Sequence, residues 1–277
     1  MANKTWVGTD SGNEGDWSVA ANWSPSGVPV NSDDVFFTSG SQSVTAGLSQ
    51  GAVTLASLRI GPGYTGDIAA SGGYLAINST LVEMSGAGSV FLNGTLTTVR
   101  VTGAQQSDAV NLNGTITNLH IIGTGVLGGI AVANSATCTN TVIQSAPAAQ
   151  VTIGTSVTAT QIDMDSGVVT FGSALTTANL YGGAFTHTAG AITTVNIEDE
   201  GLLIDQSSGT ITTLNGYGGK FDGTSQTNAS RTITNVTTYE NFELDLRSGL
   251  NNYTLSNDII YRGGVIRPDI GVTMALS

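Results

Sequence analysis

Short segments rich in threonine, each with one apolar residue at its centre, recur along most of the chain. They are 17 to 22 residues apart, and a mean spacing of about 20 residues is typical of a solenoid with one coil per repeat. The residue after each apolar centre is threonine in all eight segments. The central apolar positions are Leu96, Ile116, Cys138, Val157, Leu175, Ile192, Ile211 and Ile233.

Alternating apolar positions between these segments predict further short strands. After the strand centred on Leu96, for example, Val99 and Val101 indicate a second strand, and Val110 and Leu112 a third. Alternation directs one set of side chains inward and the next outward, as a parallel β-helix requires. The sequence therefore predicts an all-β fold: a right-handed parallel β-helix with about 20 residues and three short strands per coil.

The repeats divide the chain into three predicted parts. Residues 1–40 hold all three tryptophans, Trp6, Trp17 and Trp23, and precede the repeats. Large aromatic side chains there are expected to cover the apolar end of the first coil, with a sugar-stacking platform as the alternative. Residues 41–237 are expected to form the coils. Residues 238–277 depart from the repeat spacing and are predicted to be a C-terminal cap or a partner-binding segment.

The first 40 residues also carry a resemblance. The tryptophans, the run Asn22-Trp23-Ser24-Pro25 and the later run Asp33-Asp34-Val35-Phe36-Phe37 resemble the opening of many bacterial and phage β-helical surface proteins. Autotransporter-type passenger domains are among them. The resemblance implies a β-helical architecture more than an activity.

Charge and composition narrow the function classes. The chain has 277 residues, a formal net charge of −12 and only eight basic residues, which argues against nucleic-acid binding. No apolar run approaches the length of a transmembrane helix, so no membrane contact is expected. Without an apparent signal peptide, the protein is expected to be made and kept in a cytoplasm or released by lysis. The single cysteine, Cys138, occupies a repeat centre and is expected to be buried.

Acidic residues supply the strongest alternative chemistry. Glu198-Asp199-Glu200 follow one strand, and Asp163 and Asp165 lie in a matching strand two coils earlier if Ile162, Leu180 and Ile197 align. Two strand spacings, about 9.6 Å, touch the separation of the carboxyl groups in inverting glycosidases. A polysaccharide-cleaving enzyme is therefore an alternative, and an acidic face in contact with solvent is the simpler interpretation.

Other motifs do not indicate an enzyme. His120 and His187 lack metal-ligand spacing and are expected to lie on surface strands. No nucleotide-binding loop, nucleophile motif or zinc motif occurs. We therefore expect no catalytic residue, cofactor or metal site. The threonines after the repeat centres resemble an ice-binding array, although stacked threonines also suit any parallel sheet.

The sequence favours a structural role in a bacteriophage virion. The predicted protein is a capsid cement or decoration protein that contacts the major capsid protein and other virion proteins, as a homo-oligomer such as a trimer. The alternatives are a tail fibre or tailspike, or a secreted adhesin on a cell surface. Aromatic and arginine side chains are enriched at interfaces. The expected partner contacts are Trp6, Trp17, Trp23, Tyr239, Phe242, Arg247, Tyr253, Tyr261, Arg262 and Arg267.

Overall fold

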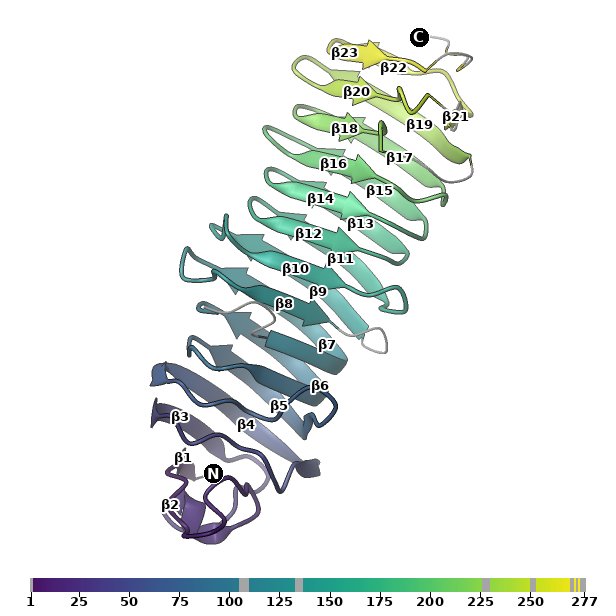
Figure 1. Cartoon of the computed structure of the whole chain (residues 1–277). Helices are drawn as coiled ribbons and strands as arrows, with labels where there is room; N and C mark the ends of the chain where they lie inside the picture. Colours follow the sequence, from purple (N-terminus) through teal and green to yellow (C-terminus); the bar gives the residue numbers. More distant parts are fainter. Residues whose placement is uncertain are drawn as a thin grey trace. The chain divides into compact units, whose positions relative to one another are not determined.

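The computed structural model describes residues 2–104, 110–132, 137–225, 230–249 and 253–269, together with 272 and 274. Its strands stack in parallel as a β-solenoid of about 11 turns, roughly 20 residues apart, which confirms the predicted fold class (Figure 1). A single turn of 3-10 helix, Ala20–Asn22, is the only helical element of the described residues. Contacts within the chain define two compact units: unit 1 is Met1–Thr139 with Ala148–Gln150, and unit 2 is Asn140–Pro147 with Val151–Ser277.

Unit 1 contains long strands that pair in chain order. Its strands are β1 (Asn3–Trp6), β2 (Trp23–Ser24), β3 (Asp34–Gly40), β4 (Ser49–Tyr64), β5 (Leu75–Met84), β6 (Val90–Val101), β7 (Val110–Ile122) and β8 (Gly129–Val132). From β3 to β8 each strand pairs in parallel with the next. β1 joins this ladder through β3 and also pairs antiparallel with β2.

Unit 2 contains shorter strands, which alternate between two ladders (Figure 1). β9 (Thr137–Gln144) and β10 (Gln150–Ile153) contribute residues to both units. One ladder holds β11 (Ala159–Met164), β13 (Leu175–Leu180), β15 (Ile192–Ile197), β17 (Ile211–Gly216), β19 (Arg231–Tyr239), β21 (Tyr253–Leu255) and β22 (Ile260–Arg262). The other holds β12 (Val168–Phe171), β14 (Ala184–His187), β16 (Leu202–Asp205), β18 (Lys220–Asp222), β20 (Glu243–Asp245) and β23 (Val265–Arg267).

The repeat centres form the core as predicted. All eight central residues, Cys138 included, are buried. In unit 2, Leu175, Ile192, Ile211 and Ile233 pair in register from one coil to the next. One position differs, because Ala159 and not Val157 pairs with Leu175. Val157 is buried just before β11 begins.

The predicted first and second strands of a coil form one continuous strand. In β15, Thr193 and Thr194 both face away from the core between the buried residues Ile192 and Val195. Two successive outward residues turn the strand through a corner while its pairing with the next coil continues. The threonines after the repeat centres face outward as expected, exposed at positions 97, 117, 158, 176, 193 and 212 and half-buried at 139 and 234.

Parallel pairing continues after residue 237. β20 pairs with β18, β22 with β19 and β23 with β20. The described part of segment 238–277 therefore adds further coil strands to unit 2 as far as Arg267.

Candidate functional site

The three tryptophans lie in the interior of unit 1. Trp23 has ring centroids 5.0 Å from Trp6 and 4.6 Å from Trp17 in edge-to-face geometry, and all three rings approach Phe37. All three tryptophans are almost fully buried. Trp23 Nε1 donates to the Trp17 carbonyl at 2.8 Å, and Trp6 Nε1 donates to Gln42 O at 3.0 Å. These rings form an aromatic core at the start of unit 1 and offer no surface to a partner.

Phe242 and Tyr253 are also buried, and two glycines explain why. A Cβ atom on Gly216 would fall within the Phe242 ring, and one on Gly223 would lie 2.5 Å from the Tyr253 hydroxyl. Gly216 occupies a register position that Ile197 fills in the preceding coil. The missing side chain leaves room for Phe242 in the core, so neither aromatic side chain is available for the partner contact predicted from the sequence.

The remaining predicted contact residues reach solvent. Tyr239 is half-buried, and Arg247, Tyr261, Arg262 and Arg267 are exposed.

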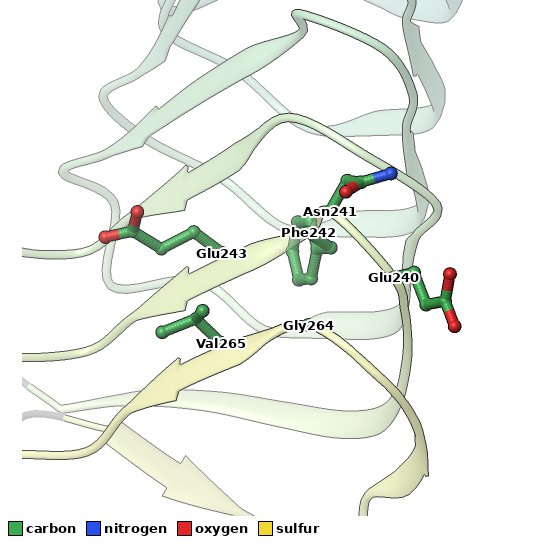
Figure 2. Close-up of a pocket in the computed structure, with 6 residues that line it drawn as sticks. All are labelled: Glu240, Asn241, Phe242, Glu243, Gly264 and Val265. Carbon is green, nitrogen blue, oxygen red and sulfur yellow. The ribbon is translucent and has the colours of Figure 1, made fainter.

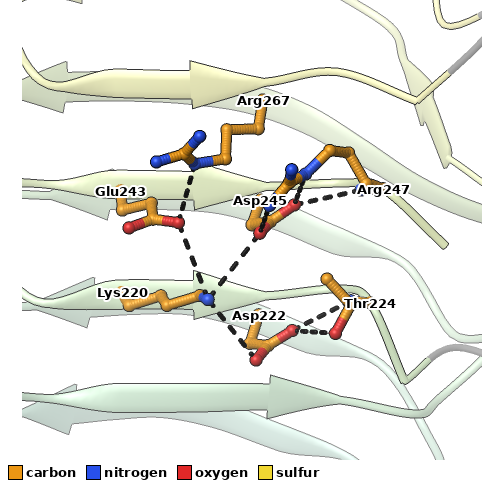
Figure 3. A network of polar contacts seen from close by, with 7 residues as sticks. All are labelled: Lys220, Asp222, Thr224, Glu243, Asp245, Arg247 and Arg267. Atoms are coloured by element: carbon orange, nitrogen blue, oxygen red, sulfur yellow. Dashed lines mark hydrogen bonds and ion pairs between the residues drawn. The ribbon is translucent and has the colours of Figure 1, made fainter.

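Two of these arginines belong to a charged network on β18, β20 and β23 (Figure 3). Arg247 donates from Nε and Nη2 to the two oxygens of Asp245, at 2.9 and 2.7 Å. These bonds hold the pKa of Asp245 at about 2. Arg267 binds Glu243 at 3.0 Å, and Lys220 lies within 3.7 Å of Asp222, Glu243 and Asp245. The three cations neutralise the carboxylates and link three successive coils.

A shallow cavity of about 440 Å³ lies beside this network (Figure 2). Glu243 and Val265, which pair on neighbouring strands, line one side. The Glu243 carboxylate binds Lys220 and Arg267 through Oε1, so the charged network forms this side of the cavity. The lining residues are Glu240, Asn241, Phe242, Glu243, Gly264 and Val265.

A second polar cluster is fully buried inside unit 2. Asp205 Oδ2 lies 2.9 Å from Arg231 Nε and accepts a hydrogen bond from the Tyr253 hydroxyl, also at 2.9 Å. Arg231 Nη1 donates to Ser207 O at 3.0 Å. Burial raises the pKa of Asp205 to about 6 against the opposing pull of Arg231. At neutral pH the carboxylate is ionised, and the pair is a core ion pair without a solvent path for substrate.

His187 completes this cluster and does not lie on the surface, contrary to the sequence prediction. It stands inward in register with Phe171 and Asp205 and is fully buried. Its Nε2 faces the Ser173 carbonyl at 3.1 Å, and Nδ1 faces Arg231 Nη2 at 3.4 Å. The carbonyl requires a proton on Nε2, so Nδ1 is the acceptor for the guanidinium. Burial, together with the charge of Arg231, lowers the pKa of His187 to about 4.

The acidic residues do not align as the sequence suggested. Ile162 pairs with Ala178, and it is Met164 that pairs with Leu180, which pairs in turn with Ile197 one coil on. Asp163 was expected to align with Glu198 and instead lies two positions earlier in the register. The carboxylate that follows the same strand end as Glu198, two coils away, is that of Asp165.

Asp163 instead ends a ladder of asparagines. Asn179 Nδ2 donates to Asp163 Oδ1 at 2.6 Å, Asn196 to Asn179 at 2.7 Å and Asn215 to Asn196 at 2.9 Å. The chain of amide hydrogen bonds holds four successive coils in register. Asp163 thus serves as the acceptor at one end of this ladder, and no pair of free carboxylates flanks it.

Across the described residues, no group of three or more His, Cys, Asp or Glu side chains is placed to hold a metal ion. Within the same residues, no helix is long and apolar enough to span a membrane. His120 lies half-buried on β7, paired with Arg100.

Comparison with known proteins gives no relative: no family model, no curated protein and no solved structure matches the chain.

Two arrangements in the structure were not predicted from the sequence. One is the buried ion pair of Asp205 and Arg231, which are 26 positions apart and carry no common motif. The other is a column of outward side chains that includes Tyr181 and Tyr217. Each of these tyrosines begins a Tyr-Gly-Gly sequence, a repeated signal that was visible in the chain.

Proposed function

We propose that the protein is a structural component of a bacteriophage virion, a capsid cement or decoration protein that binds the major capsid protein. It would be made in the host cytoplasm and assembled onto the head as a homo-oligomer. Its action is contact, which adds buried surface between capsid subunits and so opposes internal pressure. The solenoid supports this role because successive coils share a continuous core and a continuous ladder of backbone hydrogen bonds.

One observation carries the proposal: an exposed apolar cluster in the last described coil of unit 2. Ile260, Tyr261 and Val265 lie within six residues and are each 44–48% exposed. Arg267 is the last residue of β23, which also carries Val265, and Arg247 follows β20, the strand that pairs with β23. We call these five residues the terminal surface. Isoleucine, valine, tyrosine and arginine together give the apolar, aromatic and guanidinium character typical of protein interfaces.

The charge of the terminal surface also differs from that of the chain. Two of its five residues are arginines and none is acidic, whereas the net charge of the protein is −12. Arg247 and Arg267 are exposed but already pair with Asp245 and Glu243, so carboxylates of a partner would add to these ion pairs at the outer edge of each guanidinium. Because interface arginines act partly through charge, binding is expected to weaken as salt is raised.

Virion assembly tests the proposal. Particles grown with the wild-type gene are expected to carry the protein on the head in cryo-electron micrographs. The double variant Ile260→Asp/Val265→Asp places two charges in the terminal surface and is expected to reduce incorporation at least about tenfold, which corresponds to 1.4 kcal/mol.

Val168→Asp is the matched control, because Val168 is 43% exposed on β12 and lies outside the terminal surface. Its incorporation should equal that of the wild type. Virions without the protein would refute the proposed function, and equal loss in both variants would refute the assignment to the terminal surface.

A further inference from the structure

An outward column of side chains follows one corner of unit 2. The strands β11, β13, β15 and β17 end at aligned positions, Met164, Leu180, Ile197 and Gly216, and Thr238 of β19 continues this row. The residue after each of these positions belongs to the column. The backbone N–H groups of Tyr181, Glu198 and Tyr217 each donate to the coil before, at 2.8 Å, which fixes this register. Arg262 pairs with Tyr239 and extends the column by one coil. In order, the column is Asp165, Tyr181, Glu198, Tyr217, Tyr239 and Arg262.

The rings of this column are open to solvent. Tyr181 is 42% and Tyr217 45% exposed, two of the most exposed aromatic side chains among the described residues. Two glycines follow each of them. A Cβ atom at Gly182 would lie 2.5 Å from Asp165 O, and one at Gly218 would lie 2.8 Å from Asp199 N. The tight turn therefore requires glycine, and its lack of side chains leaves the Tyr181 and Tyr217 rings accessible to solvent.

The column is also ordered by its own contacts. Tyr217 and Tyr239 stack with ring centroids 4.9 Å apart and an interplanar angle of 24°. The Arg262 guanidinium lies 5.9 Å from the centre of the Tyr239 ring. Glu198 stands between Tyr181 and Tyr217 and is half-buried. Burial, together with the charges of Asp163 and Glu198, raises the pKa of Tyr181, so its hydroxyl keeps its proton.

This arrangement matches the chemistry of a sugar chain. Flat aromatic rings bind the C–H faces of sugar rings, and carboxylate oxygens accept hydrogen bonds from hydroxyl groups. Successive coils are one strand spacing apart, about 4.8 Å, which is close to the length of one sugar unit in an extended chain. An anionic ligand would be repelled by the exposed carboxylates nearby, those of Asp165, Asp199 and Glu200. A neutral glycan satisfies all of these conditions.

We propose that the column binds a neutral, extended oligosaccharide along the stack of coils, with Tyr181 and Tyr217 stacking on alternate sugar rings and Glu198 accepting hydroxyl hydrogen bonds between them. This binding goes beyond the proposed role in the virion. Tyr181, Glu198 and Tyr217 lie outside the terminal surface, so particle assembly and sugar binding can be lost separately.

The test uses the full chain in solution and three probes: the hexasaccharides of β-1,4-linked glucose, α-1,4-linked glucose and β-1,4-linked mannose. At least one is expected to bind with a dissociation constant below about 1 mM by titration calorimetry. Tyr217→Ala should raise that constant at least about tenfold. Tyr217→Phe, which keeps the ring, should change it by less than about twofold.

Tyr74→Ala is the control for loss of an aromatic ring, because Tyr74 lies in unit 1 outside the column. It should bind as the wild type does, and circular dichroism should show all variants folded. The proposal is overturned if no hexasaccharide binds, or if Tyr217→Ala binds as well as Tyr217→Phe. Binding of hexalysine alone, abolished by Glu198→Gln, would assign the column to cationic peptides and also overturn it.

Discussion

Single residues in unit 2 carry interactions that the repeat does not require. Four polar side chains stand in the core where most coils have apolar ones: Asp205, Arg231, His187 and Tyr253. Their polar atoms lie 2.9 to 4.0 Å apart. Removal of charges from water costs free energy, which the pair recovers only while both partners remain. The cluster is therefore costly to break in part, whatever its net contribution to stability.

Arg231→Met tests this dependence. The variant leaves the Asp205 carboxylate buried without its cation and is expected to lower the free energy of unfolding by about 3–5 kcal/mol. Chemical denaturation at pH 7 measures the change. In the double variant Arg231→Met/Asp205→Leu no charge remains, so most of the loss should be recovered. A single variant as stable as the wild type would show that the pair does not hold the core together.

His187 gives the protein a specific acid response. Its pKa is about 4 in the folded chain, below the ordinary value of 6.5, because burial and the nearby charge of Arg231 disfavour the protonated ring. As pH falls from 6.5 to 4, the unfolded state takes up a proton and the folded state does not, so stability decreases. This shift corresponds to a loss of about 2–4 kcal/mol over that range.

His187→Gln isolates this contribution. The amide does not titrate and still offers a donor and an acceptor. Asp205 titrates in both proteins with the opposite sign, and the same comparison in proteins that also carry Asp205→Asn separates its effect from that of His187. The wild type should lose stability relative to the variant between pH 6.5 and pH 4 in urea unfolding. Parallel pH profiles for the two proteins would contradict the assignment.

At the scale of elements, the strands combine a fixed register with local exceptions. The asparagine ladder and the buried aliphatic rows repeat from β11 to β17. Gly216 interrupts the aliphatic row, and Phe242, 26 residues later, fills the space. Two distant positions are therefore coupled through the packing of β17 against the start of β20.

Gly216→Ala is expected to destabilise the protein by about 1–3 kcal/mol, because the methyl group overlaps the Phe242 ring. Replacement of glycine within a strand would otherwise be stabilising. Gly51→Ala in β4 is the control, since its Cβ atom would meet only Ala76, at 4.0 Å, and it should not lower stability. The midpoint of thermal unfolding is measured for both variants. A lower midpoint for Gly216→Ala alone indicates the packing effect, and an equal change in both indicates a backbone effect.

At the scale of the whole molecule, each coil is stabilised by the coils next to it. Phe185 is fully buried on β14, in register with Val169 on β12 and Leu203 on β16, and it stacks on Phe171 at 6.0 Å. Solenoid stability is the sum of such nearest-neighbour terms. A lesion in one coil should therefore be felt most by the adjacent coils.

Phe185→Ala tests this locality by hydrogen exchange. Deletion of a buried phenylalanine costs about 3–5 kcal/mol. Protection should fall in β12, β14 and β16 and remain near that of the wild type in β3 to β6 of unit 1. An equal loss of protection in every strand would indicate a single cooperative unit and contradict nearest-neighbour stabilisation.

The sequence by itself determined the solenoid, its coil length and the repeating aliphatic positions of its core. Leu175, Ile192 and Ile211 recur at intervals that only a stacked parallel fold buries, because the same short-range alternation repeats in every coil. Only the tertiary structure decided which side chains of different coils meet, because that depends on the register between distant strands. Phe242 is buried because Gly216 lies one coil away, and Tyr181 and Tyr217 share a column because their strands end at the same level. Coil lengths vary by several residues, so these meetings cannot be counted along the chain and appear only when the backbone pairs.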